Sequence, residues 1–230
     1  MPDHHVPRVP SASPERAFQV STDDTVLDGD LAVPPGAIGV VAFAHGSGSS
    51  RFSPRNRRVA AALQAQGLAT LLLDLLTPEE EARDDRTREL RFDVGLLARR
   101  MVAAIDALAE AAATRSLPIG LFGASTGAAA ALLAAAERPA TVAAVVSRGG
   151  RPDLANERLP LVRAPTLLIV GARDTPVIDM NRAALAALTC PNALELISDA
   201  THLFEEAGAL DEVARLAGAW FLRHLPNDAA

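Results

Sequence analysis

Lysine is absent from this 230-residue sequence: all 22 of its basic side chains are arginines. A chain without lysine cannot use a phosphate-loop lysine, a Schiff-base lysine or a serine–lysine dyad. Cysteine is almost absent too, because Cys190 is the only one. No internal disulfide can form, and we therefore expect a reducing compartment, the cytoplasm.

An excess of positive charge and long apolar runs are also missing. The formal net charge is −6, which offers no attractive field to nucleic acid or to an anionic membrane. No apolar run reaches the length of a membrane-spanning helix. Residues 1–15 are rich in proline and lack the basic segment followed by an apolar segment that a secretion signal has. They are therefore predicted to form a flexible tail.

Short apolar runs alternate with helical patterns over the rest of the chain. Strands are predicted at residues 16–21, 25–33, 37–44, 68–76, 117–122, 141–147, 164–171 and 192–198. Helices are predicted at about residues 55–66, 90–113, 126–137, 177–188 and 205–222. This alternation predicts an α/β fold, with a mostly parallel eight-stranded sheet and helices on both faces. The first two strands should pair antiparallel at one edge.

No linker or repeat interrupts this pattern, so we predict one domain over residues 16–225, without a large cap domain. The charged stretch at residues 75–89 follows the fourth predicted strand. It is the best candidate for a small solvated flap or helix over the carboxyl edge of the sheet.

The clearest chemical motif is Gly123-Ala-Ser125-Thr-Gly127, between the strand that ends at Phe122 and the helix that begins at Thr126. Small residues on both sides let the strand and the helix approach closely, and the strained turn displays the serine hydroxyl above the sheet. The pattern alone is equally consistent with an ordinary glycine turn.

Two further side chains favour nucleophilic catalysis. Asp174 follows the seventh predicted strand and His202 follows the eighth, so both should reach the sheet edge that carries Ser125. A serine hydroxyl needs a base to take its proton, and the base needs an acid to orient it. The order Ser, Asp, His therefore predicts a catalytic triad.

Each member has alternatives. Asp153 and Asp179 are rival acids, with Asp153 the better placed, whereas Asp199 is read as a turn residue. Asp174 could instead cap the turn before the following helix, and His202 could be a half-buried neighbour of a helix start.

Acyl transfer also needs N–H donors for the oxyanion. The Thr126 N–H is one candidate, and the second is expected in the loop that begins His45-Gly46, at Ser47 or else at Gly48. We expect His45 to fix this loop and not to act as the base.

Together these residues resemble the α/β-hydrolase superfamily, and within it the dienelactone hydrolase-like branch, over about residues 16–222. The resemblance implies hydrolysis of a small-molecule ester, lactone or thioester through an acyl-serine, with no metal or organic cofactor. True dienelactone hydrolases use a cysteine where this chain has Ser125. That departure favours a general esterase, and Cys190, far from the strand ends, is expected to be inert.

Arginines recur near the predicted mouth of the site: Arg51, Arg148 and Arg151. They are candidate binding groups for a substrate carboxylate or phosphate. The alternative is that they form surface ion pairs, for instance Arg151 with Asp153.

The sequence also suggests three alternative functions. A nicotinamide oxidoreductase is disfavoured, because Arg51 replaces the last glycine of a G-x-G-x-x-G pattern that follows the wrong strand. A non-catalytic binding protein on the same scaffold and an acyltransferase with the same triad stay open. The sequence leaves the oligomeric state open.

Overall fold

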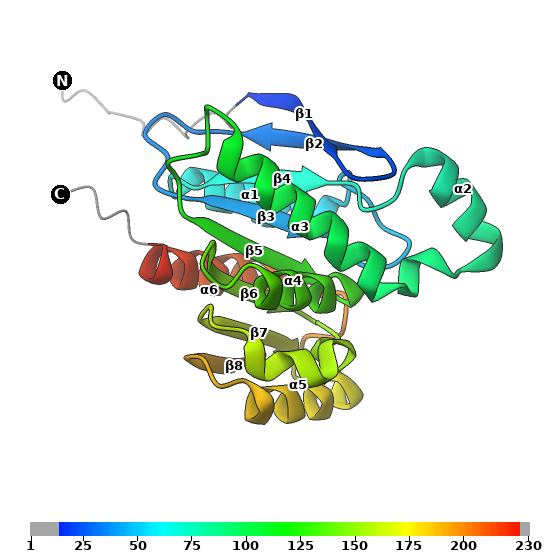
Figure 1. Ribbon diagram of the computed structural model, residues 1–230. Coiled ribbons are helices and arrows are strands. Elements are labelled where there is room, and N and C mark those ends of the chain that lie inside the picture. Colours follow the sequence, from blue (N-terminus) through cyan, green and yellow to red (C-terminus); the bar gives the residue numbers. More distant parts are fainter. Residues whose placement is uncertain (1–13, 226–230) are drawn as a thin grey trace, which may run out of the picture.

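An eight-stranded sheet runs through the centre of the computed structural model, which describes residues 14–225 (Figure 1). Its strands lie in the order β1-β2-β4-β3-β5-β6-β7-β8. The strands are β1 (Glu15–Ser21), β2 (Val26–Ala32), β3 (Val40–Ala44), β4 (Ala69–Leu73), β5 (Ile119–Ala124), β6 (Val142–Arg148), β7 (Thr166–Gly171) and β8 (Asn192–Ile197). Strand β2 pairs antiparallel with both β1 and β4, and all other neighbouring strands are parallel. The antiparallel pairing of the first two strands is as the sequence predicts for this edge.

Helices cover both faces of the sheet (Figure 1). They are α1 (Pro54–Ala65), α2 (Pro78–Thr87), α3 (Val94–Glu110), α4 (Thr126–Glu137), α5 (Thr175–Ala187) and α6 (Ala209–His224). Helices α1 and α6 pack on one face through an apolar cluster that includes Val59, Leu63 and Phe221. Helices α3, α4 and α5 pack on the other face through a second cluster. These two layers confirm the predicted α/β-hydrolase architecture.

Some boundaries differ from the sequence prediction. The helix expected over residues 90–113 begins only at Val94, because the Asp93 side chain accepts a hydrogen bond from the Leu96 N–H at 2.9 Å and caps it. Residues 90–92 form a single 3₁₀ turn, and a second 3₁₀ segment, Pro152–Leu161, was not predicted. Prolines interrupt the spacing of apolar residues in that segment, so its sequence has no helical periodicity from which a helix could be predicted.

The charged stretch proposed as a flap is a helix, α2, that stands beside the carboxyl edge of the sheet (Figure 1). Thr77 and Glu80 begin it with reciprocal side-chain-to-backbone hydrogen bonds, which form a capping box. The tail predicted for residues 1–15 lies outside the described residues, apart from its last two, and Glu15 already belongs to β1. Within residues 14–225, no helix is both long and apolar enough to cross a lipid bilayer.

Candidate active site

Ser125 occupies a strained turn between β5 and α4. Its φ of 51° and ψ of −122° lie in a region that side-chain-bearing residues rarely adopt. A Cβ on Gly123 would collide with the backbone of Ala128, and one on Gly127 would collide with the carbonyl oxygen of Ala44. The glycines are therefore required for the close approach of strand and helix that the sequence predicts.

His202 and Asp174 form a direct hydrogen bond. The His202 Nδ1 lies 2.7 Å from Asp174 Oδ2, and the side chains are 39% and 13% exposed. Asp174 stands at the N-cap of α5 but makes no capping hydrogen bond, so its carboxylate is not used by the helix. The rival acids have other partners: Asp153 binds Arg151, and the exposed Asp179 lies beside Arg182.

This pair lies next to the strand end that carries Ser125. Ala124 pairs with Arg148 across β5 and β6, and the Ser125 N–H donates to the Arg148 carbonyl oxygen at 3.2 Å. A Cβ on Gly149, the next residue, would lie 3.5 Å from His202 Nδ1. No hydrogen bond joins Ser125 Oγ to His202 within residues 14–225, and such bonds often tighten only when substrate is bound.

The two N–H groups predicted to bind the oxyanion differ in whether they are already hydrogen-bonded. Within the described part of the chain, the Thr126 N–H has no acceptor, as expected of the first residue of a helix. The Ser47 N–H donates to Thr126 Oγ1 at 2.9 Å, so a ligand can use it only by sharing or replacing this bond. The loop that carries Ser47 lies close to the candidate nucleophile, because a Cβ placed on Gly46 would lie 3.1 Å from the Ser125 Cβ.

His45 has a fixed structural role. The Leu75 N–H donates to His45 Nε2 at 3.0 Å, and Nδ1 lies 2.9 Å from the Gly46 carbonyl oxygen. Nε2 must therefore be unprotonated while Nδ1 carries the hydrogen. Burial lowers the pKa of the His45 imidazole, which agrees with this neutral form. Both ring nitrogens are engaged by backbone, so His45 has no free nitrogen with which to act as a base.

The three arginines proposed for substrate binding have different surroundings. Arg51 forms an ion pair with Asp74, and Arg151 forms one with Asp153, which is the pairing the sequence suggested. Arg148 is 8% exposed and has no carboxylate partner among the described residues.

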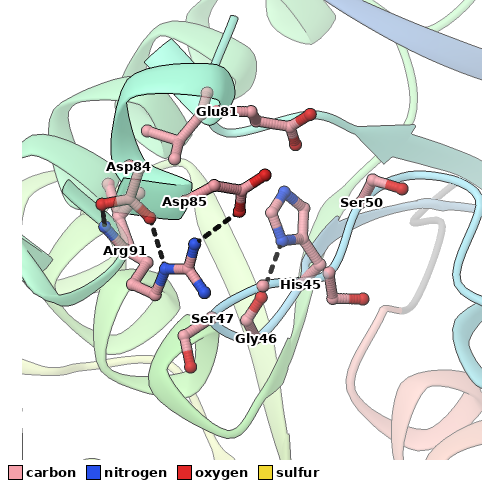
Figure 2. A pocket seen from close by; sticks show the side chains of 12 residues that line it. His45, Gly46, Ser47, Ser50, Glu81, Asp84, Asp85 and Arg91 are labelled. Atoms are coloured by element: carbon pink, nitrogen blue, oxygen red, sulfur yellow. Dashed lines mark hydrogen bonds and ion pairs between the residues drawn. The ribbon is translucent and has the colours of Figure 1, made fainter. Parts of the chain in front are cut away.

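A pocket with a volume of about 240 Å³ lies between the loop that follows β3 and the helix α2. Figure 2 shows the side chains that line it. Arg91 reaches into it and binds Asp84 and Asp85. Burial raises the pKa of the Glu81 carboxyl, and the nearby charges of Asp74 and Asp85 act in the same direction. Ser125 and His202 do not line this pocket, but Gly46 and Ser47 do. A small ligand there would lie against the loop that adjoins Ser125.

The sequence singled out the loop side of this pocket, but not the individual charged side chains that line its other side. The only sign of them in the sequence is a run of mixed charges, which is also typical of a solvated helix.

Cys190 is buried before β8, at the amino ends of the strands, and burial raises the pKa of its thiol. In the described part of the chain, His, Cys, Asp and Glu side chains form no group of three or more suited to a metal ion.

Comparison with known proteins identifies the family. A family model described as "Alpha/beta hydrolase domain" matches residues 37–214. The chain belongs to the α/β-hydrolase family. The matched region contains Ser125, Asp174 and His202.

Solved α/β-hydrolase structures resemble this chain at two levels of similarity. A dienelactone hydrolase from Anabaena variabilis ATCC 29413 is 60% identical; the match covers 94% of this chain and 100% of that chain, with a TM-score of 0.92. Est1E from Butyrivibrio proteoclasticus is 16% identical over 90% of this chain and 98% of that one, with a TM-score of 0.76. The second likeness shows the fold alone.

A curated relative carries a different kind of name. A provisionally named phosphoribosyl transferase of Mycobacterium tuberculosis (strain H37Rv) is 54% identical over 211 residues, which are 92% of this chain and 47% of that protein. The same values hold for its counterpart in strain CDC 1551. This α/β-hydrolase chain thus spans about half the length of the curated relatives it matches.

Proposed function

We propose that this chain is a serine hydrolase that cleaves carboxylic esters of small molecules through an acyl-serine intermediate. The observation that carries the proposal is the 2.7 Å hydrogen bond between His202 Nδ1 and Asp174, at the sheet edge where Ser125 stands on its strained turn. A carboxylate bound to Nδ1 leaves Nε2 as the nitrogen that can take a proton.

Each residue has a defined role in this mechanism. Ser125 Oγ attacks the acyl carbon, and His202 Nε2 removes its proton and then gives it to the leaving alcohol. Asp174 holds the imidazole in the required tautomer and stabilises the imidazolium. The Thr126 N–H, at the positive end of α4, stabilises the oxyanion, and the Ser47 N–H joins it by exchanging Thr126 Oγ1 for the oxyanion. In the second half of the reaction, His202 Nε2 takes a proton from water, whose oxygen attacks the acyl carbon. The bond from this carbon to Ser125 Oγ then breaks, Oγ takes the proton back from His202, and the free acid leaves.

The name of one relative supports a hydrolase that acts on lactones, which are cyclic esters. The Anabaena protein is called a dienelactone hydrolase, and its match covers nearly all of this chain. The phosphoribosyl transferase name belongs to proteins about twice as long, because the match covers only 47% of them. The matched part of this chain includes Ser125, Asp174 and His202. Ser125 favours esters as substrates, and lactones and thioesters are the next classes to examine.

The experiment that tests the proposal combines labelling with turnover. The wild-type chain should react with a fluorophosphonate probe and hydrolyse p-nitrophenyl acetate. Ser125→Ala should abolish labelling and lower kcat by about 10⁵-fold or more. Ser198→Ala, a change at an exposed serine after β8, is the matched control and should behave as wild type.

Two outcomes would contradict the proposal. Undiminished labelling or turnover in Ser125→Ala would assign the chemistry to another residue. A folded wild-type chain that neither reacts with the probe nor cleaves any aryl ester, lactone or thioester would favour a binding protein on this scaffold.

A further inference from the structure

Arg91 is held in place by a buried carboxylate. Asp84 is 1% exposed, and it accepts the Leu90 N–H at 2.7 Å and the Arg91 N–H at 3.2 Å. The Arg91 Nε forms an ion pair with the same carboxylate, and Nη2 donates to Asp85 at 2.9 Å. Two of the three guanidinium nitrogens are thus fixed by acids of α2. Because the guanidinium is planar, the third nitrogen, Nη1, is fixed with them.

This third nitrogen lies against the loop that follows β3. A Cβ placed on Gly48 would lie 3.1 Å from Arg91 Nη1 and 3.9 Å from Arg91 Cζ. Figure 2 shows the guanidinium between the acids of α2 and this loop. Nη1 makes no hydrogen bond within residues 14–225, so its interaction with the loop is one of packing.

Gly48 belongs to a tight turn that also contains Ser47, the second candidate donor for the oxyanion. The Ser49 N–H donates to the Gly46 carbonyl oxygen at 3.2 Å and closes the turn. Gly48 has a φ of 67°, whereas the φ of Ser47 is not positive. This is the pattern of a type II turn, whose third residue is normally glycine. A displacement of Gly48 therefore also moves the peptide group that carries the Ser47 N–H.

The turn has little other support during the proposed reaction. The loop on either side of it is anchored by the hydrogen bonds of His45 and of the Arg51 N–H. The turn itself is tied to the site by the bond from the Ser47 N–H to Thr126 Oγ1, which the proposed mechanism exchanges for the oxyanion. Arg91 takes no part in that exchange, so its contact with the turn persists.

We propose that Arg91 is a positioning residue, which packs on the turn at Gly48 and so aims the Ser47 N–H at the oxyanion. An oxyanion donor must be in place before the charge develops, and a small displacement weakens its effect. In this role Arg91 acts through the loop backbone and does not touch the substrate. The inference rests on the proposed function, because the Ser47 N–H binds an oxyanion only if Ser125 is the nucleophile.

The first experiment removes the contact but keeps the anchor. In Arg91→Gln the amide nitrogen takes the place of Nε and can still donate to Asp84, whereas Cζ and Nη1 are gone. For p-nitrophenyl acetate, kcat should fall by about 10- to 100-fold, which is less than the loss of a whole oxyanion donor. KM should change by less than about twofold, because the oxyanion forms only in the transition state.

The matched control removes the same charge from a neighbouring place. Arg86 is exposed in the last turn of α2, and Arg86→Gln should keep the kcat and KM of wild type. Equal losses of kcat in the two variants would overturn the proposal, because the effect would then be one of charge alone. A rise in KM with an unchanged kcat in Arg91→Gln would also overturn it, because Arg91 would then bind the substrate directly.

The second experiment approaches the contact from the loop. Gly48→Ala adds a Cβ that lies 3.1 Å from Arg91 Nη1, at a strained φ of 67°, and should lower kcat. In the Arg91→Gln background, the loss caused by Gly48→Ala should be smaller by about threefold or more, because the crowding is gone while the backbone strain is unchanged. Additive losses would overturn the proposal. A Gly48→Ala protein as active as wild type would do so even if Arg91→Gln fails to fold.

The third experiment separates this inference from the proposed chemistry. Amide hydrogen exchange, resolved by NMR, is compared between Ser125→Ala and Ser125→Ala/Arg91→Gln, neither of which needs to turn over. The Ser49 N–H, which closes the turn, should exchange about tenfold faster or more in the second variant. The Leu75 N–H, which His45 holds, should keep its rate.

The outcomes of this comparison distinguish the two proposals. Equal exchange rates at Ser49 would defeat the support of the turn by Arg91 even if Ser125 proves to be the nucleophile. Faster exchange at Ser49, in a chain whose turnover does not depend on Ser125, would uphold the support of the turn and refute the proposed function.

Discussion

Two loops of this molecule each place a histidine after a parallel strand, and they use it in opposite ways. His45, after β3, is 6% exposed, and both of its ring nitrogens are engaged by backbone groups. His202, after β8, is 39% exposed, with Asp174 on Nδ1 and no partner on Nε2 among the described residues. A similar position at the sheet edge therefore does not decide the role of a histidine. The role of each histidine is decided by whether its second ring nitrogen is hydrogen-bonded to the protein.

The largest contrast is expected when each ring is removed. His202→Ala should lower kcat for p-nitrophenyl acetate by about 10⁵- to 10⁶-fold, because Ser125 would lose the base that takes its proton. The free energy of unfolding should change little, since the side chain is substantially exposed. Steady-state kinetics and urea denaturation measure the two quantities.

A result in which His202→Ala unfolds the protein but leaves the remaining folded molecules active would reverse the comparison. His202 would then be the structural histidine, and the search for the base would return to other groups at the sheet edge.

The next effect concerns the acid beside His202. Asp174→Asn should lower kcat by about 10⁴-fold, because an amide cannot hold the imidazole in the tautomer that frees Nε2 for the proton. Asp153→Asn is the matched control: its carboxylate pairs with Arg151, so turnover should stay close to wild type. Similar losses in both variants would mean that Asp153 shares the orienting role.

The same residues show how far the sequence could go. The strands, the glycines around Ser125 and the order Ser, Asp, His are local patterns, and each fixes where a backbone segment ends relative to the sheet. Those expectations placed Asp174 and His202 at one edge, where they form a hydrogen bond. The helix over residues 126–137 also has the predicted limits.

Pairing of side chains was harder to predict, because it depends on which segments meet in space. Arg51 pairs with Asp74, 23 residues away, and nothing in either local sequence indicates this. The same holds for Ser47, whose N–H meets a hydroxyl 79 residues away. Three arginines that look alike in the sequence thus become two ion pairs and one cation, Arg148, with no carboxylate partner within residues 14–225.

A smaller effect, on stability, is expected at His45. His45→Leu should lower the free energy of unfolding by about 2–5 kcal/mol, because it leaves the Leu75 N–H and the Gly46 carbonyl oxygen without their partner. His45→Gln should cost less, since its side-chain oxygen can still accept the Leu75 N–H. Chemical denaturation gives both values. A His45→Gln protein that is stable but as inactive as His202→Ala would show that His45 takes part in the chemistry.

The smallest effect is the pH dependence that His45 gives to folding. Burial lowers the pKa of its imidazole below the ordinary value of 6.5, although the Gly46 carbonyl and Asp74 oppose this shift. Below about pH 6.5, the unfolded chain binds a proton at His45 that the folded chain does not, so stability falls as the pH falls. The slope contributed is at most about 1.4 kcal/mol per pH unit.

The measurement is the difference in unfolding free energy between wild type and His45→Gln, taken by urea denaturation at pH 7.5, 6.5 and 5.5. Titrations common to both proteins cancel in this difference, and wild type should lose its advantage on acidification because only it carries the imidazole. A difference that stays constant or grows toward pH 5.5 would mean that His45 accepts a proton in the folded state. One of its two backbone hydrogen bonds would then have to break, and the distinction between the two histidine loops would no longer hold.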